Sequence, residues 1–149
     1  MELDRSRTGR RNLLLASLPA KDFALLAPQL KDMVLEQGTV LQEQGERIDQ
    51  VYFPHHGIVS LLAVMRQGDA IETATIGYEG AVGAFAGFGM RRAHTRAVVQ
   101  VRGSASRSGV ALPQGCRGQR RRLQNRRAIW RDVADPSSAN RGLQRVASG

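Results

Sequence analysis

The chain has 149 residues, a formal net charge of +9 and a single cysteine, Cys116. This length suits one domain with a core of its own. The sequence has no run of about 18 apolar residues and no cationic start leading into an apolar signal core, so it predicts a cytoplasmic protein with no membrane contact. The single cysteine can form no internal disulfide, which agrees with a reducing compartment.

The positive charge is concentrated near the C-terminus. Residues 1–103 contain 12 lysines and arginines and 11 acidic residues, whereas residues 104–149 contain 10 arginines and only 2 aspartates. A chain that is basic throughout would point to nucleic acid as a partner. This sequence instead indicates a nearly neutral domain followed by an arginine-rich tail.

Two short helices are predicted at the start of the chain, over residues 12–18 and 20–30, with Pro19 between them. In the second segment Phe23, Leu25, Leu26 and Leu30 form one apolar face behind a polar start. Such a face packs on a core or on a partner protein, and core packing is the interpretation we favour.

From residue 33 the apolar residues recur about every second position, in short runs separated by glycine. Turn signals recur about every 8–12 residues, which is typical of an antiparallel sandwich or barrel. The sequence therefore predicts a mainly β domain with N-terminal helices. The predicted strands cover residues 33–35, 38–41, 51–53, 57–64, 70–76 and 96–101.

A glycine-rich stretch, residues 77–85, follows the fifth of these strands. Glycines at 77, 80 and 83 permit positive φ and close backbone approach. If residues 81–85 form a helical turn, its first amides could hold an anion such as a phosphate. A plain connection between strands is the alternative, and the spacing alone favours it.

The glycines and strands together resemble a known family. Residues 38–41 followed by 44–46, residues 51–53 followed by 57–59, and residues 80–85 are similar to the sensor domain of the Crp/Fnr transcriptional regulators. The resemblance covers residues 12–103. It implies an N-terminal helical segment over residues 1–31 and an antiparallel double-stranded β-roll, a jelly roll of the cyclic-nucleotide-binding type, over residues 32–103. Full-length relatives bind DNA as homodimers through a long helix and a helix-turn-helix that follow the roll.

The ligand-binding residues implied by the resemblance depart from the pattern of nucleotide-binding members. Where they have Gly-Glu-Leu, with a carboxylate for the ribose, this chain has Ala81 in place of the glutamate. The family arginine that pairs with the cyclic phosphate falls on Thr95, and Arg96 stands one residue later, where a strand turns its side chain to the opposite face. The implied segment comprises Gly80, Ala81, Val82, Gly83, Ala84, Thr95, Arg96 and Ala97.

Losing both partners would remove roughly 3–6 kcal/mol of binding free energy. We therefore expect no tight binding of a cyclic nucleotide and no cofactor. The pocket is expected to hold either an unknown small-molecule effector or only its own side chains.

The sequence shows no pattern typical of an enzyme or a metal site. His55, His56 and His94 are scattered and lack the fixed spacing of metal ligands. No Ser/His/Asp order or carboxylate pair stands out, so we expect neither a catalytic nor a metal site.

The tail, residues 104–149, is predicted to be irregular, because glycine, proline and clustered arginines do not form the long helix that the resemblance implies. A frameshift near residues 104–109 would explain this composition, and the chain would then be a sensor domain without the dimer helix and the DNA-binding domain. The alternative is a non-specific nucleic-acid-binding protein that uses its tail on phosphates. The contacts would come from Arg120, Arg121, Arg122, Arg126 and Arg127.

Overall fold

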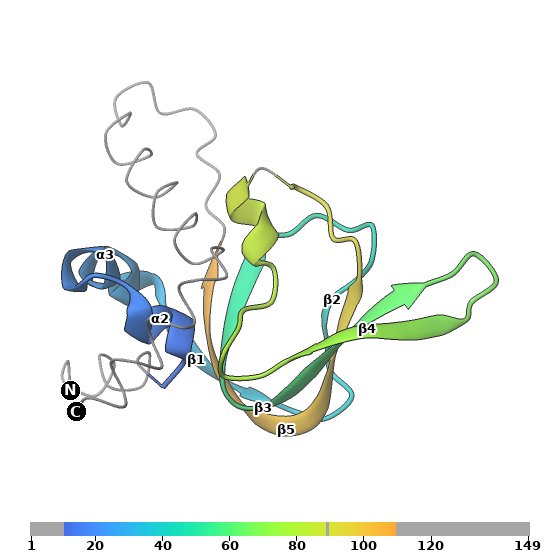
Figure 1. Cartoon of the computed structure of the whole chain (residues 1–149), viewed down its shortest axis with the longest axis horizontal. Coiled ribbons are helices and arrows are strands. Elements are labelled where there is room, and N and C mark those ends of the chain that lie inside the picture. Colours follow the sequence, from blue (N-terminus) through green and yellow to red (C-terminus); the bar gives the residue numbers. More distant parts are fainter. Residues whose placement is uncertain (1–10, 89, 110–149) are drawn as a thin grey trace.

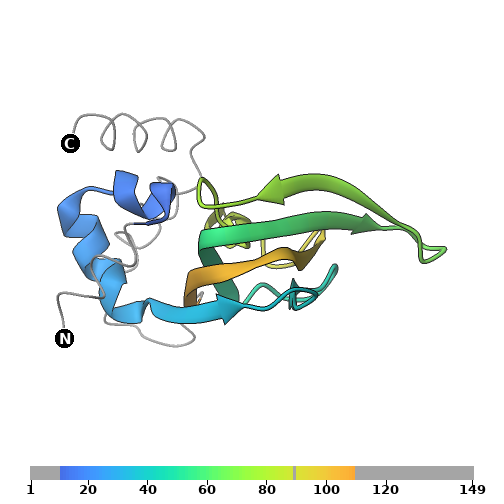
Figure 2. The same ribbon diagram turned by 90° about the horizontal axis from the view of Figure 1, so that it is seen from below.

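The computed structural model describes residues 11–88 and 90–109, which form an antiparallel sheet curled into a roll with short helices at one end (Figure 1). Figure 2 shows a long hairpin leaving the roll at the end opposite the helices. The elements are α2 (Leu13–Ser17), α3 (Ala20–Leu26), the 3-10 turn η1 (Ala27–Gln29), β1 (Lys31–Leu35), β2 (Val40–Gln42), β3 (Gln50–Val64), β4 (Ala70–Ile76), the 3-10 turn η2 (Ala84–Phe88) and β5 (Arg96–Gly109). This architecture confirms the predicted mainly β jelly roll with N-terminal helices.

The two helices begin and end at residues that the sequence marks. Asn12 caps α2, since its side chain accepts from the amides of Leu14 and Leu15, and Pro19 precedes α3. The second predicted helix, over residues 20–30, is α-helical only to Leu26. Pro28 lacks the N–H that an α-helix would use, and the chain continues as the 3-10 turn η1.

Strand β5 is the central strand of the sheet. The strand order is β1-β5-β3-β4, and β2 also pairs with β5. The two short strands share the long one, since β2 pairs with Ala97 and Val98 and β1 pairs with residues 103–107. The predicted strand over residues 96–101 is therefore the first part of β5, the strand with which β1, β2 and β3 all pair.

Strand β3 joins two segments that the sequence predicts as separate strands, residues 51–53 and 57–64. The pairing register with β5 shifts on both sides of His56, and Gly57 has φ +87°. A Cβ on Gly57 would lie 2.5 Å from the carbonyl oxygen of Val101, so only glycine permits this close crossing of the two strands. Because of this bend, β3 pairs with β5 on both sides of Gly57 as one continuous strand.

The predicted boundary at residue 103 is wrong, because β5 continues to Gly109. The predicted irregular tail, residues 104–149, therefore begins at least six residues too early. Residues 104–107 pair with β1 and residues 104–109 with β3. Serine and glycine favour loops, but here Ser106 and Ser108 are buried and alternate with other side chains as a strand requires.

Two apolar clusters hold the described residues together. The first joins the helices to one face of β3 through residues such as Leu15, Phe23 and Phe53. The second fills the roll and includes Tyr52, Val59, Val82, Val99 and others. The side chains of β3 alternate between these clusters. One face of this strand therefore packs against the helices, and the other faces the interior of the roll.

Several sequence-based predictions lie outside the described residues. They concern the arginines at 120, 121, 122, 126 and 127, the cysteine at 116, the predicted irregular structure of residues 110–149, and the first ten residues of the predicted N-terminal segment. Within the described ranges, no helix combines the length and apolarity needed to span a bilayer.

A buried polar chain crosses β3, β5 and β1. His55 lies in β3 and is buried. Its Nε2 lies 2.8 Å from Ser106 Oγ, and that hydroxyl donates to Asp32 Oδ1 at 2.8 Å. Because the hydroxyl proton goes to Asp32, Nε2 of His55 donates to Ser106 and carries the ring proton.

We expect stability to fall at mildly acidic pH because of His55. Burial lowers the pKa of His55 from 6.5, Asp32 opposes this shift, and Arg11 and His56 add to it. Below pH 6.5 the unfolded chain takes up a proton that the folded protein resists, so the free energy of unfolding should decrease from pH 7.5 to 5.5, by at most about 1.4 kcal/mol per pH unit. Urea unfolding at several pH values measures this slope.

A matched pair of variants assigns the slope to one residue. His55→Gln should flatten it, whereas His56→Gln, at the exposed neighbouring position, should change it only slightly, because His56 is the smallest contributor to the shift. Equal slopes in the wild type and in His55→Gln would contradict the assignment.

Candidate functional site

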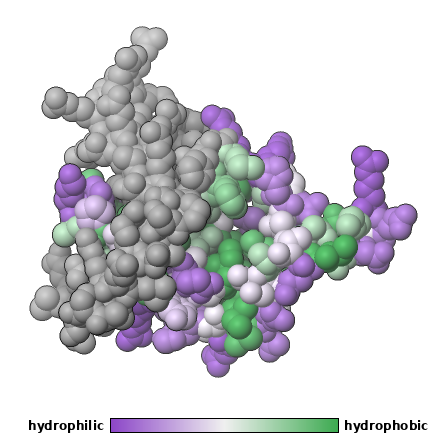
Figure 3. Space-filling view, in the orientation of Figure 1, coloured by the Kyte–Doolittle hydropathy of each residue, from purple (hydrophilic) through white to green (hydrophobic). Residues whose placement is uncertain are grey.

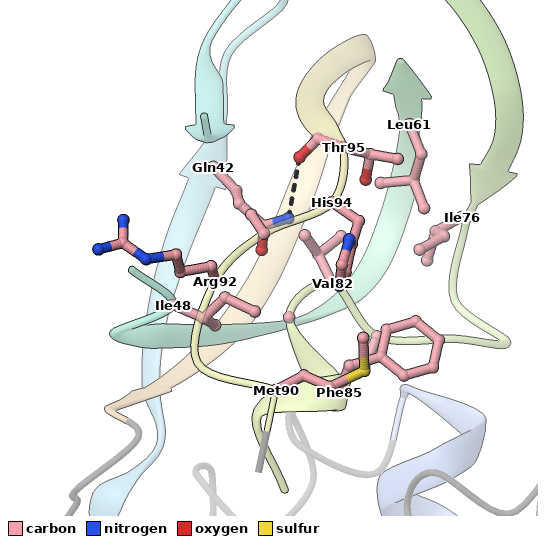
Figure 4. A pocket seen from close by; sticks show the side chains of 13 residues that line it. Gln42, Ile48, Leu61, Ile76, Val82, Phe85, Met90, Arg92, His94 and Thr95 are labelled. Carbon is pink, nitrogen blue, oxygen red and sulfur yellow. Dashed lines mark hydrogen bonds between the residues drawn. The ribbon is translucent and has the colours of Figure 1, made fainter. Parts of the chain in front are cut away.

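A cavity of about 310 Å³ opens into the roll beside η2 (Figure 4). Its walls come from β2, β3, β4, η2 and the segment before it, the segment between β2 and β3, and the segment that leads into β5. The lining residues are Gln42, Ile48, Leu61, Ile76, Ala81, Val82, Gly83, Phe85, Met90, Arg92, Ala93, His94 and Thr95. A cavity of this size at the open end of a roll is large enough for a small molecule.

The glycine-rich segment forms one wall and is fixed by pairing with β3. Val82 and Tyr52 exchange two backbone hydrogen bonds of 2.9 Å. Gly83 then turns the chain with φ +85°, and a Cβ there would lie 2.6 Å from the carbonyl oxygen of Gln50. The helical turn begins at Ala84, later than the sequence predicts, because residue 82 is held in a bridge to β3.

The opposite wall is residues 90–95, which run alongside residues 45–48. Gly45 N donates to Ala93 O at 2.8 Å, Ile48 N to Arg91 O at 2.9 Å, and Ala93 N returns a bond to Glu46 O at 2.9 Å. This pairing brings His94 to the cavity. The sequence gives no sign of this pairing, since neither segment has the alternating pattern of a strand.

Arg92 lines the cavity, but its guanidinium does not point into it. The Nη1 group donates to the carbonyl oxygen of Gly45 at 2.8 Å. Figure 4 shows the guanidinium directed away from the space on which Leu61, Ile76 and His94 converge. The positive charge of Arg92 is therefore held at the outer surface.

Thr95 and Arg96 lie on different sides of the chain. Thr95 lines the cavity, and its carbonyl oxygen accepts from Gln42 Nε2 at 3.1 Å. Arg96 Nε instead donates to Glu43 Oε1 at 2.6 Å. This hydrogen bond from Arg96 is the main reason that the pKa of Glu43 is lowered from its usual value. The arginine that follows Thr95 is thus paired with a carboxylate outside the cavity.

Four of the eight residues predicted for ligand binding line the cavity: Ala81, Val82, Gly83 and Thr95. The other four do not line it. Ala97 is fully buried in the apolar core of the roll, Ala84 packs against the helical cluster, Arg96 pairs with Glu43, and Gly80 lies in the turn that precedes the wall. Thr95 stands just before β5, and its side chain and that of Arg96 face opposite sides of the chain.

The residue that ties this wall to the helices is Asn12, which is fully buried. Its Nδ2 donates to Pro54 O and to Gly80 O, both at 2.8 Å, while its Oδ1 caps α2. Leu13 N also donates to Tyr78 O at 2.8 Å. The start of α2 is therefore bonded directly to the segment that enters the cavity wall. The sequence marks Asn12 as a helix start, and nothing in it indicates the second role.

Comparisons with known proteins agree with this fold. The family model for the cyclic nucleotide-binding domain matches residues 33–105. No curated protein matches the sequence. Solved structures do match, at 20% identity or less in the three described next, so they show the fold alone.

The chain is similar to a mutant regulatory subunit of a cAMP-independent protein kinase A from Trypanosoma brucei, bound to cAMP, with 15% identity and a TM-score of 0.66. That match covers 99% of this chain, which spans about half of the subunit, 49%. The N-terminal domain of a transcriptional regulator from Streptomyces coelicolor A3(2) gives 20% identity and a TM-score of 0.58, covering 95% of this chain and 90% of that one. The sensor domain of the regulator DNR from Pseudomonas aeruginosa gives 16% identity and a TM-score of 0.64, covering 99% and 90%. By its sequence match and its fold, the region 33–105 is a cyclic nucleotide-binding domain.

Proposed function

We propose that this chain is the ligand-sensing domain of a Crp/Fnr-type transcriptional regulator, and that its effector is not a cyclic nucleotide. The observation that carries the proposal is the composition of the cavity wall. None of the described lining residues is acidic, and the guanidinium of Arg92 is bonded to Gly45 O outside the cavity. The likeness to sensor domains of transcriptional regulators supports the sensing role.

A cyclic nucleotide places an anionic phosphate and a ribose hydroxyl in such a pocket. Removing a phosphate from water costs several kcal/mol unless a cation or strong donors replace its hydration. At the two implied positions this chain offers the methyl group of Ala81 and the hydroxyl of Thr95. We expect dissociation constants for cAMP and cGMP above about 10 μM.

Restoring the two side chains should restore binding. In the variant Ala81→Glu/Thr95→Arg, we expect isothermal titration calorimetry to show cAMP affinity at least about 100-fold higher than in the wild type, because a charge-assisted phosphate bond and a hydroxyl bond are regained. Thr95→Arg alone should recover the larger share, since it supplies the charge. The cAMP-bound mutant of the Trypanosoma brucei subunit also carries a threonine replaced by arginine among its three substitutions.

Arg96→Ala is the matched control. It removes a guanidinium one residue away, but that group pairs with Glu43, so we expect no change in cAMP affinity. Micromolar binding of cAMP by the wild type that Arg96→Ala abolishes would show that Arg96 serves the phosphate, and the proposal would fail.

A further inference from the structure

We infer that the cavity accepts an uncharged, mainly apolar ligand about the size of a two-ring aromatic molecule. The inference rests on the proposed function, because it names the chemical class of the effector for the same cavity. It depends on three properties of the described residues: the size of the cavity, the exposure of its apolar rim, and the placement of its polar groups.

The size of the cavity sets the size of the ligand. A cavity of roughly 150 Å³ lined by leucine, isoleucine and phenylalanine is enough to bind benzene. The cavity here, at about 310 Å³, is about twice as large. It therefore has room for two fused rings, or for one ring with a short chain.

The rim of the cavity exposes apolar side chains that a ligand would cover. Phe85 and Met90 both line the cavity, yet they are 61% and 38% exposed. The backbone holds them together, since Met90 N donates to Phe85 O at 3.3 Å. Figure 3 shows apolar surface over η2. Large exposed apolar groups beside a cavity are typical of a ligand site, because binding removes them from water.

The interior of the cavity is equally apolar. Leu61, Ile76 and Val82 form its inner wall, and they also belong to or pack on the core of the roll. A ligand that contacts them must leave its hydration behind, which is favourable for rings and unfavourable for charges.

The polar groups of the lining lie on the side formed by Gln42, His94 and Thr95. Gln42 is oriented by its bond to Thr95 O, and its Oε1 faces the turn at Gly83, 3.5 Å from where a Cβ would stand. Amide, imidazole and hydroxyl groups can orient one hydroxyl or carbonyl of a ligand. With Arg92 directed outward, this side provides no guanidinium or carboxylate to neutralise a charged ligand.

The test compares 1-naphthol with naphthalene-1-sulfonate, which share their rings and differ in charge. In calorimetric titration of the whole chain we expect a dissociation constant below about 100 μM for 1-naphthol and binding at least about tenfold weaker for the sulfonate. Equal binding, or tighter binding of the sulfonate, would overturn the inference.

Two substitutions locate the ligand. Ile76→Trp places an indole in the cavity wall and should weaken 1-naphthol binding at least about tenfold. Ile71→Trp makes the same change on the same strand, at an exposed position that does not line the cavity, and should have no effect. Equal effects of the two variants would place the ligand elsewhere and overturn the inference.

A third variant inverts the preference and does not depend on filling the cavity. Thr95→Arg should tighten sulfonate binding and weaken that of 1-naphthol, since it adds a cation to the wall. Thermal unfolding shows whether each variant is folded, and if Ile76→Trp is not, the result for Thr95→Arg decides.

The two proposals fail in different ways. If 1-naphthol, naphthalene-1-sulfonate and cAMP all fail to bind, the inferred class of ligand is wrong and the proposed function stands. If cAMP binds the wild type below about 10 μM, the proposed function itself is wrong.

Discussion

Replacing Asn12 with alanine should destabilise the protein by about 3 kcal/mol or more. The substitution removes the cap of α2, worth about 1 kcal/mol, and leaves the carbonyl groups of Pro54 and Gly80 without their donor, at about 1–3 kcal/mol for each one that water does not reach. Asn12 is fully buried, so water has poor access to these groups. Urea denaturation followed by circular dichroism measures the loss.

The same variant should loosen the cavity wall. Gly80 begins the segment that leads to Val82 and Gly83, and its carbonyl is tied to α2 through Asn12. We expect amide hydrogen exchange over residues 80–86 to quicken more than exchange in the centre of β5, because the wall loses a bond that the sheet keeps. Uniform acceleration along the chain would show a global effect instead.

Asn12→Asp separates the two roles of this side chain. Aspartate keeps an acceptor for the amides of α2 but has no group to donate to Pro54 O and Gly80 O. If capping alone mattered, this variant would be as stable as the wild type, and the tether to the cavity wall would be refuted. Ser17→Ala, which removes a single buried bond to Leu14 O, serves as the reference for an ordinary loss of about 1 kcal/mol.

Gly103→Ala should be the most damaging single methyl addition along β5. A Cβ on Gly103 would overlap the carbonyl group of His56 and lie 2.6 Å from Gly57 N. All these atoms belong to the backbone of β3 where it bends, so no side chain can move aside. We expect a loss of more than about 3 kcal/mol, a large share of the stability of a domain this size.

Gly109→Ala is the control on the same strand. There the nearest atom to a Cβ is Gln50 Nε2, at 3.9 Å, which is an ordinary contact. Thermal unfolding should leave Gly109→Ala within a few degrees of the wild type and lower the midpoint of Gly103→Ala by more than about 10 °C. Similar midpoints for the two variants would mean that the strands separate at the bend without cost.

The sequence predicts two departures from the nucleotide-binding members of the family that it resembles. The resemblance assigns a glutamate and an arginine to the positions of Ala81 and Thr95, and both residues line the cavity. The positions of His94 and Arg92 at the cavity could not be predicted, because they depend on backbone pairing with residues 45–48. The pairing of Arg96 with Glu43, 53 residues away, could not be predicted either.

The class of fold can be predicted from the sequence alone, because alternation of apolar residues and the order of the glycines are local signals that each segment carries. The starts of the helices can be predicted as well, through Asn12 and Pro19. Two features depend on contacts between distant segments: residues 50–64 form one bent strand, and β5 runs to Gly109. Serine and glycine form a strand at the end of β5 only because it lies between two partner strands. The link from Asn12 to Gly80 was likewise decided by folding, because it joins residues 68 positions apart and a buried side chain meets such partners only when the core closes.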